Sequence, residues 1–494
     1  MEQKKIGFWT VVFFVFGSCV GTGIFFKNNT IIANTGSLTF LIIAWLVSIF
    51  AIICLCVSIK QVAIKAKLKN EIGIYGWAKV FCNNYFYKGV RNFMLYFSIP
   101  VLMFYLPYYA IQSIMDALSV FINGVSINSW LMIVFAIILF FYFILIPIFS
   151  KKAILVQNSI FSLLKFIPLL FGIIAGLLVF FIVNQGKPQI PLIDSHLNIP
   201  SNKPFSLTTF SPYLGIIASI PAIFFSFDGF YNSSSIESRM KEPKQFPKAM
   251  ILGILLVGVV YLTFSICLVL GTKNGTLVEL TSHLGDPNIL WVKILKFILL
   301  FLVAIAIFSV ANNWGLFTID MMKTSFEKKE ILFFKKVNTK SEFKKYFLII
   351  LLLLSYFLIL TFVGCFYIED SVYEGINNYD DTSKKIFSFI NLIGNWSSLF
   401  VYIGLAIIII GYLRQYKDCG TTIKIFSYLS ILFISISVVF EVINAFVTLI
   451  SSILWQIQNP KTNITTYLIP NISKMLLLIV LIIICYTNKK EKNI

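Results

Sequence analysis

The stretch Gly17-Ser-Cys-Val-Gly-Thr-Gly-Ile-Phe25 lies inside the first long apolar run of the chain. Three of its nine residues are glycine, and Ser18 and Thr22 add small polar groups. A glycine inside a helix costs roughly 1 kcal/mol relative to alanine. In a membrane, backbone that lacks helical hydrogen bonds is tolerated only where it is buried in protein or lines a cavity. We therefore expect the helix to break here, at a place where the backbone contacts something other than lipid.

The composition is that of a membrane protein. Of the 494 residues, 58% are hydrophobic and only 12% are charged, whereas soluble domains carry about 25% charged residues. The net charge of +19 comes mostly from short loops between apolar runs, which indicates membrane topology rather than nucleic-acid binding. The eight cysteines are scattered, and His196 and His283 fall in separate loops. We therefore expect neither a metal site nor a cofactor.

Twelve apolar runs are long enough to span a membrane, which takes about 20 residues. They lie at 6–32, 36–59, 92–117, 129–149, 153–184, 212–235, 248–271, 289–318, 346–367, 386–413, 422–451 and 468–487. The loops between them read as connectors or short amphipathic helices, so we expect one all-α, polytopic transmembrane domain over 1–494.

The basic residues predict the orientation of these spans. Loops on the side of the N-terminus carry 29 of the 40 basic residues and the opposite side carries ten, while Lys165 lies inside a span. Positively charged loops remain in the cytoplasm. With an even number of spans, we expect both termini on the cytoplasmic side. We also expect the protein to lie in the plasma membrane.

The sixth run contains a second interruption. It reads Pro221-Ala-Ile-Phe-Phe-Ser-Phe-Asp-Gly-Phe-Tyr-Asn-Ser-Ser-Ser235, with Asp228 and Gly229 in its middle. The first and the sixth runs each open a group of five, and interrupted helices in matching positions of two halves indicate a transporter site between inverted repeats. The alternative is that these small residues serve close packing between helices.

Broken helices offer complementary groups to an amino acid. The start of one helical half presents N–H groups with partial positive charge, and the end of the other presents carbonyls. The carboxylate of an amino acid matches the first set, and its ammonium group matches the second.

Gly17–Phe25 resembles the first-helix motif of the amino acid–polyamine–organocation (APC) superfamily of permeases. Phe225–Phe230, with the downstream stretch Glu237–Ala249, resembles the sixth helix and the following loop of that family. Asn70–Trp77 is similar to the loop after the second helix, although the usual proline and paired glycines are degraded here. Leu413-Arg414 at the end of the tenth span also fits.

This resemblance implies a LeuT-type fold of five-plus-five inverted repeats with two C-terminal helices. Repeat one would cover about 6–184, repeat two about 212–413, and the extra helices about 422–487. It also implies a secondary transporter of amino acids, bacterial in type, that works by alternating access.

The resemblance further assigns residues to the substrate. The N–H groups that would bind the carboxylate belong to Gly21, Thr22 and Gly23. The carbonyls that would receive the α-amino group belong to Cys19, Phe225, Ser226 and Asp228, next to Gly229. Phe227 or Phe230 would close over the substrate. Trp314 resembles an aromatic residue that lines the chamber in some members, with simple packing as the alternative.

Three ionisable residues fall clearly inside spans, where insertion costs about 2.5–3.5 kcal/mol at the helix centre. Lys165 resembles a lysine that occupies the sodium position in some family members, so it would couple transport to protons or replace an ion; a structural ion pair is the alternative. Asp228 would cap the second half of its helix or contact a cationic substrate. Glu441 lies outside the ten-helix core, which favours a structural or oligomer contact.

We expect proton-coupled symport or amino acid exchange, with protons as the candidate coupling partner. One alternative is transport of a polyamine or another organic cation on the same fold. A polytopic membrane enzyme is a further alternative, although clustered acids, histidines or metal ligands, which such an enzyme needs, are missing from the sequence. A channel would differ from a carrier by showing no trans-stimulation. The sequence does not name the amino acid, because backbone groups bind only what all amino acids share.

Overall fold

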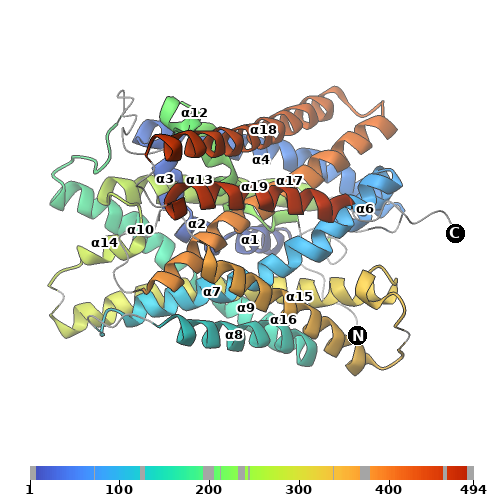
Figure 1. Ribbon diagram of the computed structural model, residues 1–494, viewed down its shortest axis with the longest axis horizontal. Helices are drawn as coiled ribbons and strands as arrows, with labels where there is room; N and C mark the ends of the chain where they lie inside the picture. The colour runs from blue at the N-terminus through green and yellow to red at the C-terminus, as the bar shows by residue number, and fades with distance from the viewer. Residues whose placement is uncertain are drawn as a thin grey trace. The chain divides into compact units, whose positions relative to one another are not determined.

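The computed structural model describes residues 7–69, 71, 73–122, 128–192, 205–211, 213–231, 240–242, 245–286, 288–337, 339–367, 379–459 and 464–486. Within these ranges the regular elements are helices and no strand occurs. Figure 1 labels the principal helices along the chain.

The first half of the chain contains α1 (Phe8–Cys19), α2 (Thr22–Phe26), α3 (Asn28–Thr35), α4 (Leu38–Lys67), α5 (Gly73–Phe81), α6 (Asn84–Phe93), η1 (Met94–Ser98), α7 (Ile99–Leu118), α8 (Ser129–Phe149), α9 (Lys151–Leu164), α10 (Phe166–Leu178), η2 (Val179–Val183), α11 (Leu207–Phe210) and α12 (Leu214–Phe227). The second half contains α13 (Phe246–Gly271), α14 (Leu277–Ser282), α15 (Leu290–Glu327), η5 (Leu332–Phe334), α16 (Glu342–Phe366), α17 (Asp381–Gln415), α18 (Thr421–Gln458) and α19 (Ile464–Tyr486).

Eleven helical stretches in the described residues are long and apolar enough to cross a membrane. They correspond to eleven of the twelve predicted spans. The predicted span 212–235 is represented by α12, which has 14 residues and ends at Phe227, while 232–235 lie outside the described residues. The all-α, polytopic prediction is therefore confirmed, with its sixth helix interrupted as expected.

The fifth predicted span, 153–184, contains more than one helix. It is divided into α9 and α10, which meet at Lys165. Pro168 gives the physical reason: it has no N–H to donate to the carbonyl of Leu164, and its ring disfavours an unbroken helix at that point.

Local sequence signals explain how α3 turns into α4. Gly36 ends α3 with φ +63°, a left-handed conformation that favours glycine. Ser37 then caps α4, its hydroxyl accepting the N–H of Phe40 over 3.4 Å. This turn joins the second half of the interrupted first span to the long α4.

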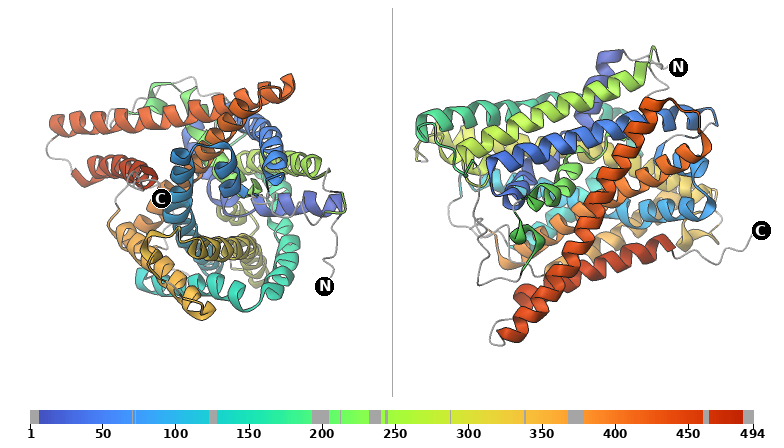
Figure 2. Two further views of the ribbon diagram at one scale, coloured as in Figure 1. Left: turned by 90° about the vertical axis from the view of Figure 1, so that its right-hand side faces the viewer. Right: turned by 90° about the horizontal axis from the view of Figure 1, so that it is seen from above.

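The helices form two compact units, each drawn from several parts of the chain. The first comprises 1–93, 169–283 and 395–494, and the second comprises 94–168 and 284–394. In the first unit α13 packs against α1 and α4, and α12 packs against α2, α3 and α4. α18 also lies against α4 and α12 (Figure 2), and α19 packs against α6 and α18. Both interrupted helices therefore belong to the same unit.

The second unit is centred on α15, which packs against α7, α8 and α9. α16 packs against α7, where the Tyr108 hydroxyl and the Thr361 hydroxyl are hydrogen-bonded over 3.0 Å. Asp380 joins the starts of α8 and α17, since its carboxylate accepts the N–H groups of Ser129 and Ser383, each over 2.8 Å. Burial alone would raise the pKa of Asp380, but the hydrogen bonds from Ser383 and Ser129 hold that pKa below its usual range.

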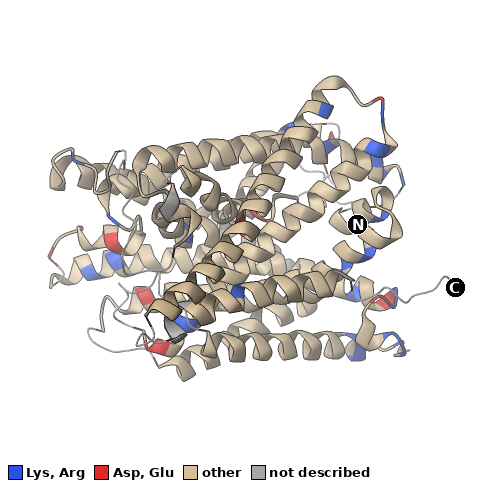
Figure 3. Ribbon diagram, turned by 45° about the horizontal axis from the view of Figure 1, so that its top comes forward, with Lys and Arg blue, Asp and Glu red and all other residues tan. Residues whose placement is uncertain are grey.

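The distribution of charge and apolar surface agrees with a membrane protein. Figure 3 shows Lys, Arg, Asp and Glu mainly near helix ends and in loops, with long uncharged stretches between them. Large apolar side chains are exposed along the outer helices, including Ile138 on α8, Phe362 on α16 and Ile479 on α19. Lipid is the solvent that such a surface requires.

Candidate functional site

The predicted break in the first span is present. α1 ends at Cys19, Val20 and Gly21 leave helical geometry, and α2 begins at Thr22. The N–H of Lys27 bonds the Gly23 carbonyl over 2.8 Å, which carries the helical path from α2 toward α3. Among the described residues, no side chain caps the N-terminal end of α2.

The second predicted break is present as well. α12 ends at Phe227, after which Asp228 adopts an extended ψ of 143°. Gly229 has φ +99°, a conformation that side chains with a Cβ rarely adopt. The serines and Asn232 that follow, and Glu237 of the downstream motif, lie outside the described residues.

The two breaks contact each other within the first compact unit. A Cβ on Gly23 would lie only 2.2 Å from the Cα of Ser226, so the backbones meet at the distance that only glycine permits. The Cys19 thiol donates to the Phe227 carbonyl, with an S···O distance of 3.6 Å. Gly23 therefore contributes to close packing between the helices, the alternative role considered above for the small residues of the breaks. Binding of a substrate by Gly23 would be an additional role. Replacing Gly23 by a bulky residue such as Leu would disrupt this packing as well as the approach of a substrate. That substitution therefore does not test substrate binding alone.

Asp228 makes local hydrogen bonds at the end of α12. Its Oδ1 accepts the N–H of Gly229 over 3.0 Å and the hydroxyl of Tyr231 over 2.7 Å. These bonds stabilise the turn that ends the helix. They do not decide between the two roles predicted for Asp228, because residues 232–239, where the second half of the helix would continue, lie outside the described residues.

The predicted closing residues are both buried. The Phe227 ring packs against Trp45 and Tyr261, with centroids 6.3 and 5.5 Å away. Phe230 is fully buried and contacts the ring of Tyr231. The Phe225 ring lies 4.5 Å from the Nζ of Lys27, whose side chain is fully buried.

Lys165 and Trp314 belong to the second compact unit, not to the unit that holds the breaks. Lys165 lies between α9 and α10 and is fully buried. Trp314 is buried on α15 and packs edge-on against Phe317 over 5.4 Å. The structure thus brings together the residues near 19–23 and 225–230, while Lys165 and Trp314 remain predictions.

A buried polar network fixes the helix that follows the first break. The Asn28 amide donates to the Gly275 carbonyl over 2.8 Å, and the hydroxyl of Ser265 bonds the Asn28 side-chain oxygen. Trp45 donates to the same hydroxyl of Ser265 over 3.0 Å. This network ties α3 to α4 and α13, and buried polar groups of this kind rigidify a structure when all are satisfied.

Sequence reasoning missed three residues at the breaks. Lys27 could have been found, because it is an ionisable residue within the predicted span 6–32 and such residues are expensive in a membrane. Tyr261 and Tyr402, whose hydroxyls donate to the carbonyls of Cys19 and Phe224, carry no such signal. From the sequence alone, a tyrosine in an apolar run is interpreted as a packing residue. Its hydrogen-bond partner is known only from the structure.

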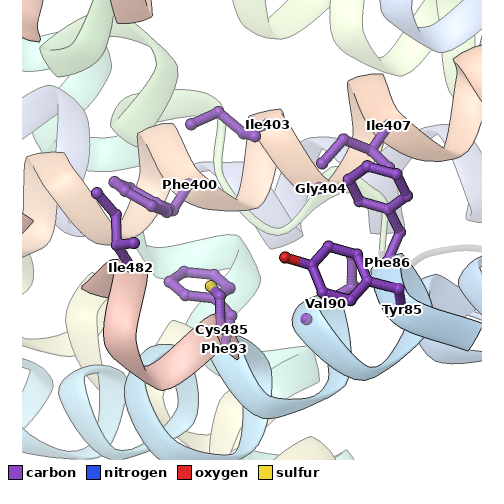
Figure 4. Close-up of a pocket in the computed structure, with 11 residues that line it drawn as sticks. Tyr85, Phe86, Val90, Phe93, Phe400, Ile403, Gly404, Ile407, Ile482 and Cys485 are labelled. Carbon is purple, nitrogen blue, oxygen red and sulfur yellow. The ribbon is translucent and has the colours of Figure 1, made fainter. Parts of the chain in front are cut away.

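Two apolar pockets lie away from the breaks. One, of about 180 Å³, lies between α6, α17 and α19 in the first unit, and Figure 4 shows Tyr85, Val90 and Phe400 among its lining residues. The other, of about 560 Å³, lies between α7 and α8 in the second unit. None of the predicted site residues lines either pocket.

Comparisons with known proteins agree with this architecture. The model of the family described as amino acid permease matches residues 6–469. A Mycoplasma pneumoniae protein described as uncharacterized is 28% identical over 488 residues, which cover 91% of this chain and 84% of that protein.

Solved structures match at lower identity and therefore show the fold alone. MhsT in complex with L-phenylalanine matches with a TM-score of 0.57 and 17% identity, over 87% of this chain and 97% of that chain. The manganese transporter of Eremococcus coleocola matches with a TM-score of 0.53 and 12% identity, over 97% and 94%. Both are transporters of the LeuT-type fold. The chain therefore belongs to the amino acid permease family of the APC superfamily and is a multi-pass membrane protein and secondary transporter, not an enzyme.

Proposed function

We propose that this transporter carries amino acids and binds their shared carboxylate and ammonium groups at the two helix breaks. The observation that carries the proposal is the contact between the breaks, with Gly23 packed against Ser226 in one compact unit. The uncapped N-terminal end of α2 supplies N–H groups for the carboxylate, from Gly21, Thr22 and Gly23. The end of α12 supplies carbonyls for the ammonium.

Two further observations support an amino acid substrate. The fold relative MhsT is described in complex with L-phenylalanine. A manganese transporter shares the fold, but among the described residues no group of three His, Cys, Asp or Glu side chains could hold a metal ion. An organic cation such as a polyamine is the second candidate, because Asp228 places a carboxylate at the end of α12.

Uptake into proteoliposomes tests the substrate class. Each of the twenty amino acids competes with a labelled mixture of amino acids, at two pH values and with or without sodium. We expect several amino acids to compete, and putrescine to have no effect. Competition by putrescine alone would favour the organic cation, and an absence of trans-stimulation by internal unlabelled substrate would contradict a carrier.

We further propose that Lys165 takes the place of a coupling ion, so that transport is linked to protons or proceeds by exchange. The full burial of Lys165 at the junction of α9 and α10 supports this role, because ionisable residues inside membrane spans are rare and mark ion or proton pathways. Lys165→Ala should abolish the pH dependence of uptake, and Lys165→Arg, which keeps the charge, is the matched variant. Unchanged uptake and pH dependence in Lys165→Ala would contradict the role.

We propose inverted repeats at 6–184 and 212–413, with additional helices at 422–487. Each compact unit combines helices from both repeats, as interlocked repeats require.

We also propose that the protein lies in the cell membrane with both termini in the cytoplasm, since the basic residues concentrate on one side of the predicted topology. Protease accessibility of terminal tags in intact cells tests the orientation: cleavage from outside would contradict it.

A further inference from the structure

Each helix break interrupts the pattern of backbone hydrogen bonds at the carbonyl end of a helix. In an intact helix the Cys19 carbonyl would accept the N–H of Gly23, and the Phe224 carbonyl would accept the N–H of Asp228. The chain instead leaves helical geometry after Cys19, and the Asp228 N–H bonds the Phe225 carbonyl over 3.2 Å. Because a buried carbonyl without a donor destabilises the structure, each of these ends needs a donor from elsewhere.

Two tyrosine hydroxyls supply the donors. Tyr261, on α13, donates to the Cys19 carbonyl over 2.9 Å. Tyr402, on α17, donates to the Phe224 carbonyl over 3.1 Å. Both tyrosine side chains are fully buried, and all four residues belong to the first compact unit. Each hydroxyl therefore holds the last part of one broken helix from an intact neighbouring helix.

The tyrosine rings fix these hydroxyls in position. The Tyr402 ring stacks on the Phe224 ring with centroids 4.4 Å apart. The Tyr261 ring packs against Trp45 and Phe227 with centroids 5.9 and 5.5 Å apart. Since Phe227 ends α12, Tyr261 contacts the second break with its ring while its hydroxyl bonds the first.

We propose that Tyr261 and Tyr402 are positioning residues of the transport site, which hold the carbonyl ends of the two broken helices through their hydroxyls. The proposal rests on the proposed function, because it concerns the carbonyl ends that would receive the ammonium of an amino acid. Groups that are already ordered before binding give higher affinity, since less conformational freedom is lost on binding. The hydroxyls should therefore control substrate affinity more than the rate of transport.

Phenylalanine variants separate the hydroxyls from the rings. Tyr261→Phe and Tyr402→Phe keep the ring contacts, and each removes one hydrogen bond to a buried carbonyl. Tyr108→Phe is the matched control: Tyr108 is fully buried, its ring stacks on Phe357, and its hydroxyl bonds Thr361 rather than a helix end. Any general effect of removing a buried hydroxyl appears in all three variants.

Hydrogen–deuterium exchange of the full chain in detergent, without substrate, tests the helix ends directly. Tyr261→Phe should accelerate exchange in a peptide spanning 18–26, and Tyr402→Phe in one spanning 224–231. We expect roughly 5- to 150-fold faster exchange, which corresponds to the loss of one donor to a buried acceptor. The control should change neither peptide. Unchanged exchange at the two breaks, or equal acceleration in all three variants, would overturn the proposal.

Uptake kinetics then test the link to the substrate, with the amino acid that competes most strongly in the screen as the probe. We expect KM to rise roughly tenfold in Tyr261→Phe and Tyr402→Phe, with the maximal rate changed less than about twofold. An unchanged KM in both variants would overturn the positioning role even if exchange is faster. If the wild-type protein transports no amino acid, the proposed function fails and so does the link to the substrate. The exchange pattern then decides separately whether the hydroxyls hold the helix ends.

Discussion

The two helix breaks use glycine for different physical reasons. At the first, Gly21 has φ −169° and ψ −132°, outside the left-handed region. At the second, Gly229 has φ +99°, which strains any residue with a Cβ. Gly23 is required for a third reason, because the backbone of Ser226 leaves no space for a Cβ. The first break therefore depends on close contact, and the second depends on backbone conformation.

The two breaks also differ in the polar groups that they present. In the part of the chain that the structure describes, no side chain caps the start of α2, whose first N–H groups are the ones that we propose for the carboxylate. After the end of α12, the Asp228 carboxylate accepts hydrogen bonds from the N–H of Gly229 and the hydroxyl of Tyr231. The breaks are complementary rather than equivalent, as the recognition of two opposite charges on one amino acid requires.

Gly23→Ala should have the largest effect, because the new Cβ would collide with backbone that cannot rotate away. We expect a loss of about 3 kcal/mol in the free energy of unfolding, the upper end of the usual range for overpacking. Denaturant or thermal unfolding of the purified protein measures it.

Gly404→Ala is the matched control for this variant. Gly404 lies inside α17, and a Cβ there would be 3.8 Å from the nearest atom, on Val90. That change should be neutral or stabilise the helix by up to about 1 kcal/mol. Equal stability of Gly23→Ala and Gly404→Ala would mean that the close contact between the breaks is wrong.

Gly229→Ala should have the next largest effect, through backbone strain alone. A residue with a Cβ in the left-handed region costs roughly 1–2 kcal/mol. Gly21→Ala tests the comparison, because the φ of −169° at Gly21 lies outside the left-handed region and predicts a smaller loss of stability than in Gly229→Ala. If Gly21→Ala keeps stability but raises KM, the first break requires glycine for substrate approach. A larger loss of stability in Gly21→Ala than in Gly229→Ala would reverse the comparison.

The sequence predicted the breaks because their signals are local. Three glycines near Gly21 and the pair Asp228-Gly229 disfavour a helix whatever surrounds them, and the apolar runs follow from hydropathy alone. Partners at a distance in the chain could not be predicted. Tyr261 is 242 residues from Cys19, and Tyr402 is 178 residues from Phe224. Only the folded chain shows that Gly23 faces Ser226.

Asp228→Asn should have a small effect on stability and decides between the two roles of Asp228. The amide oxygen of Asn can accept both hydrogen bonds that Asp228 Oδ1 accepts from Gly229 and Tyr231. If capping is the role, stability should fall by less than about 1 kcal/mol, since only the charge assistance of two hydrogen bonds is lost. The ratio of L-lysine to L-leucine uptake should then stay constant.

Asp228→Ala provides the contrast, because it removes the acceptor and leaves the hydroxyl of Tyr231 without this partner. It should cost more stability than Asp228→Asn, about 1–3 kcal/mol. A shift of Asp228→Asn from cationic toward neutral amino acids, with stability unchanged, would show instead that the carboxylate contacts the side chain of the substrate. The second break would then select the substrate as well as bind its ammonium, which the first break cannot do because Gly17–Phe25 contains no acidic residue.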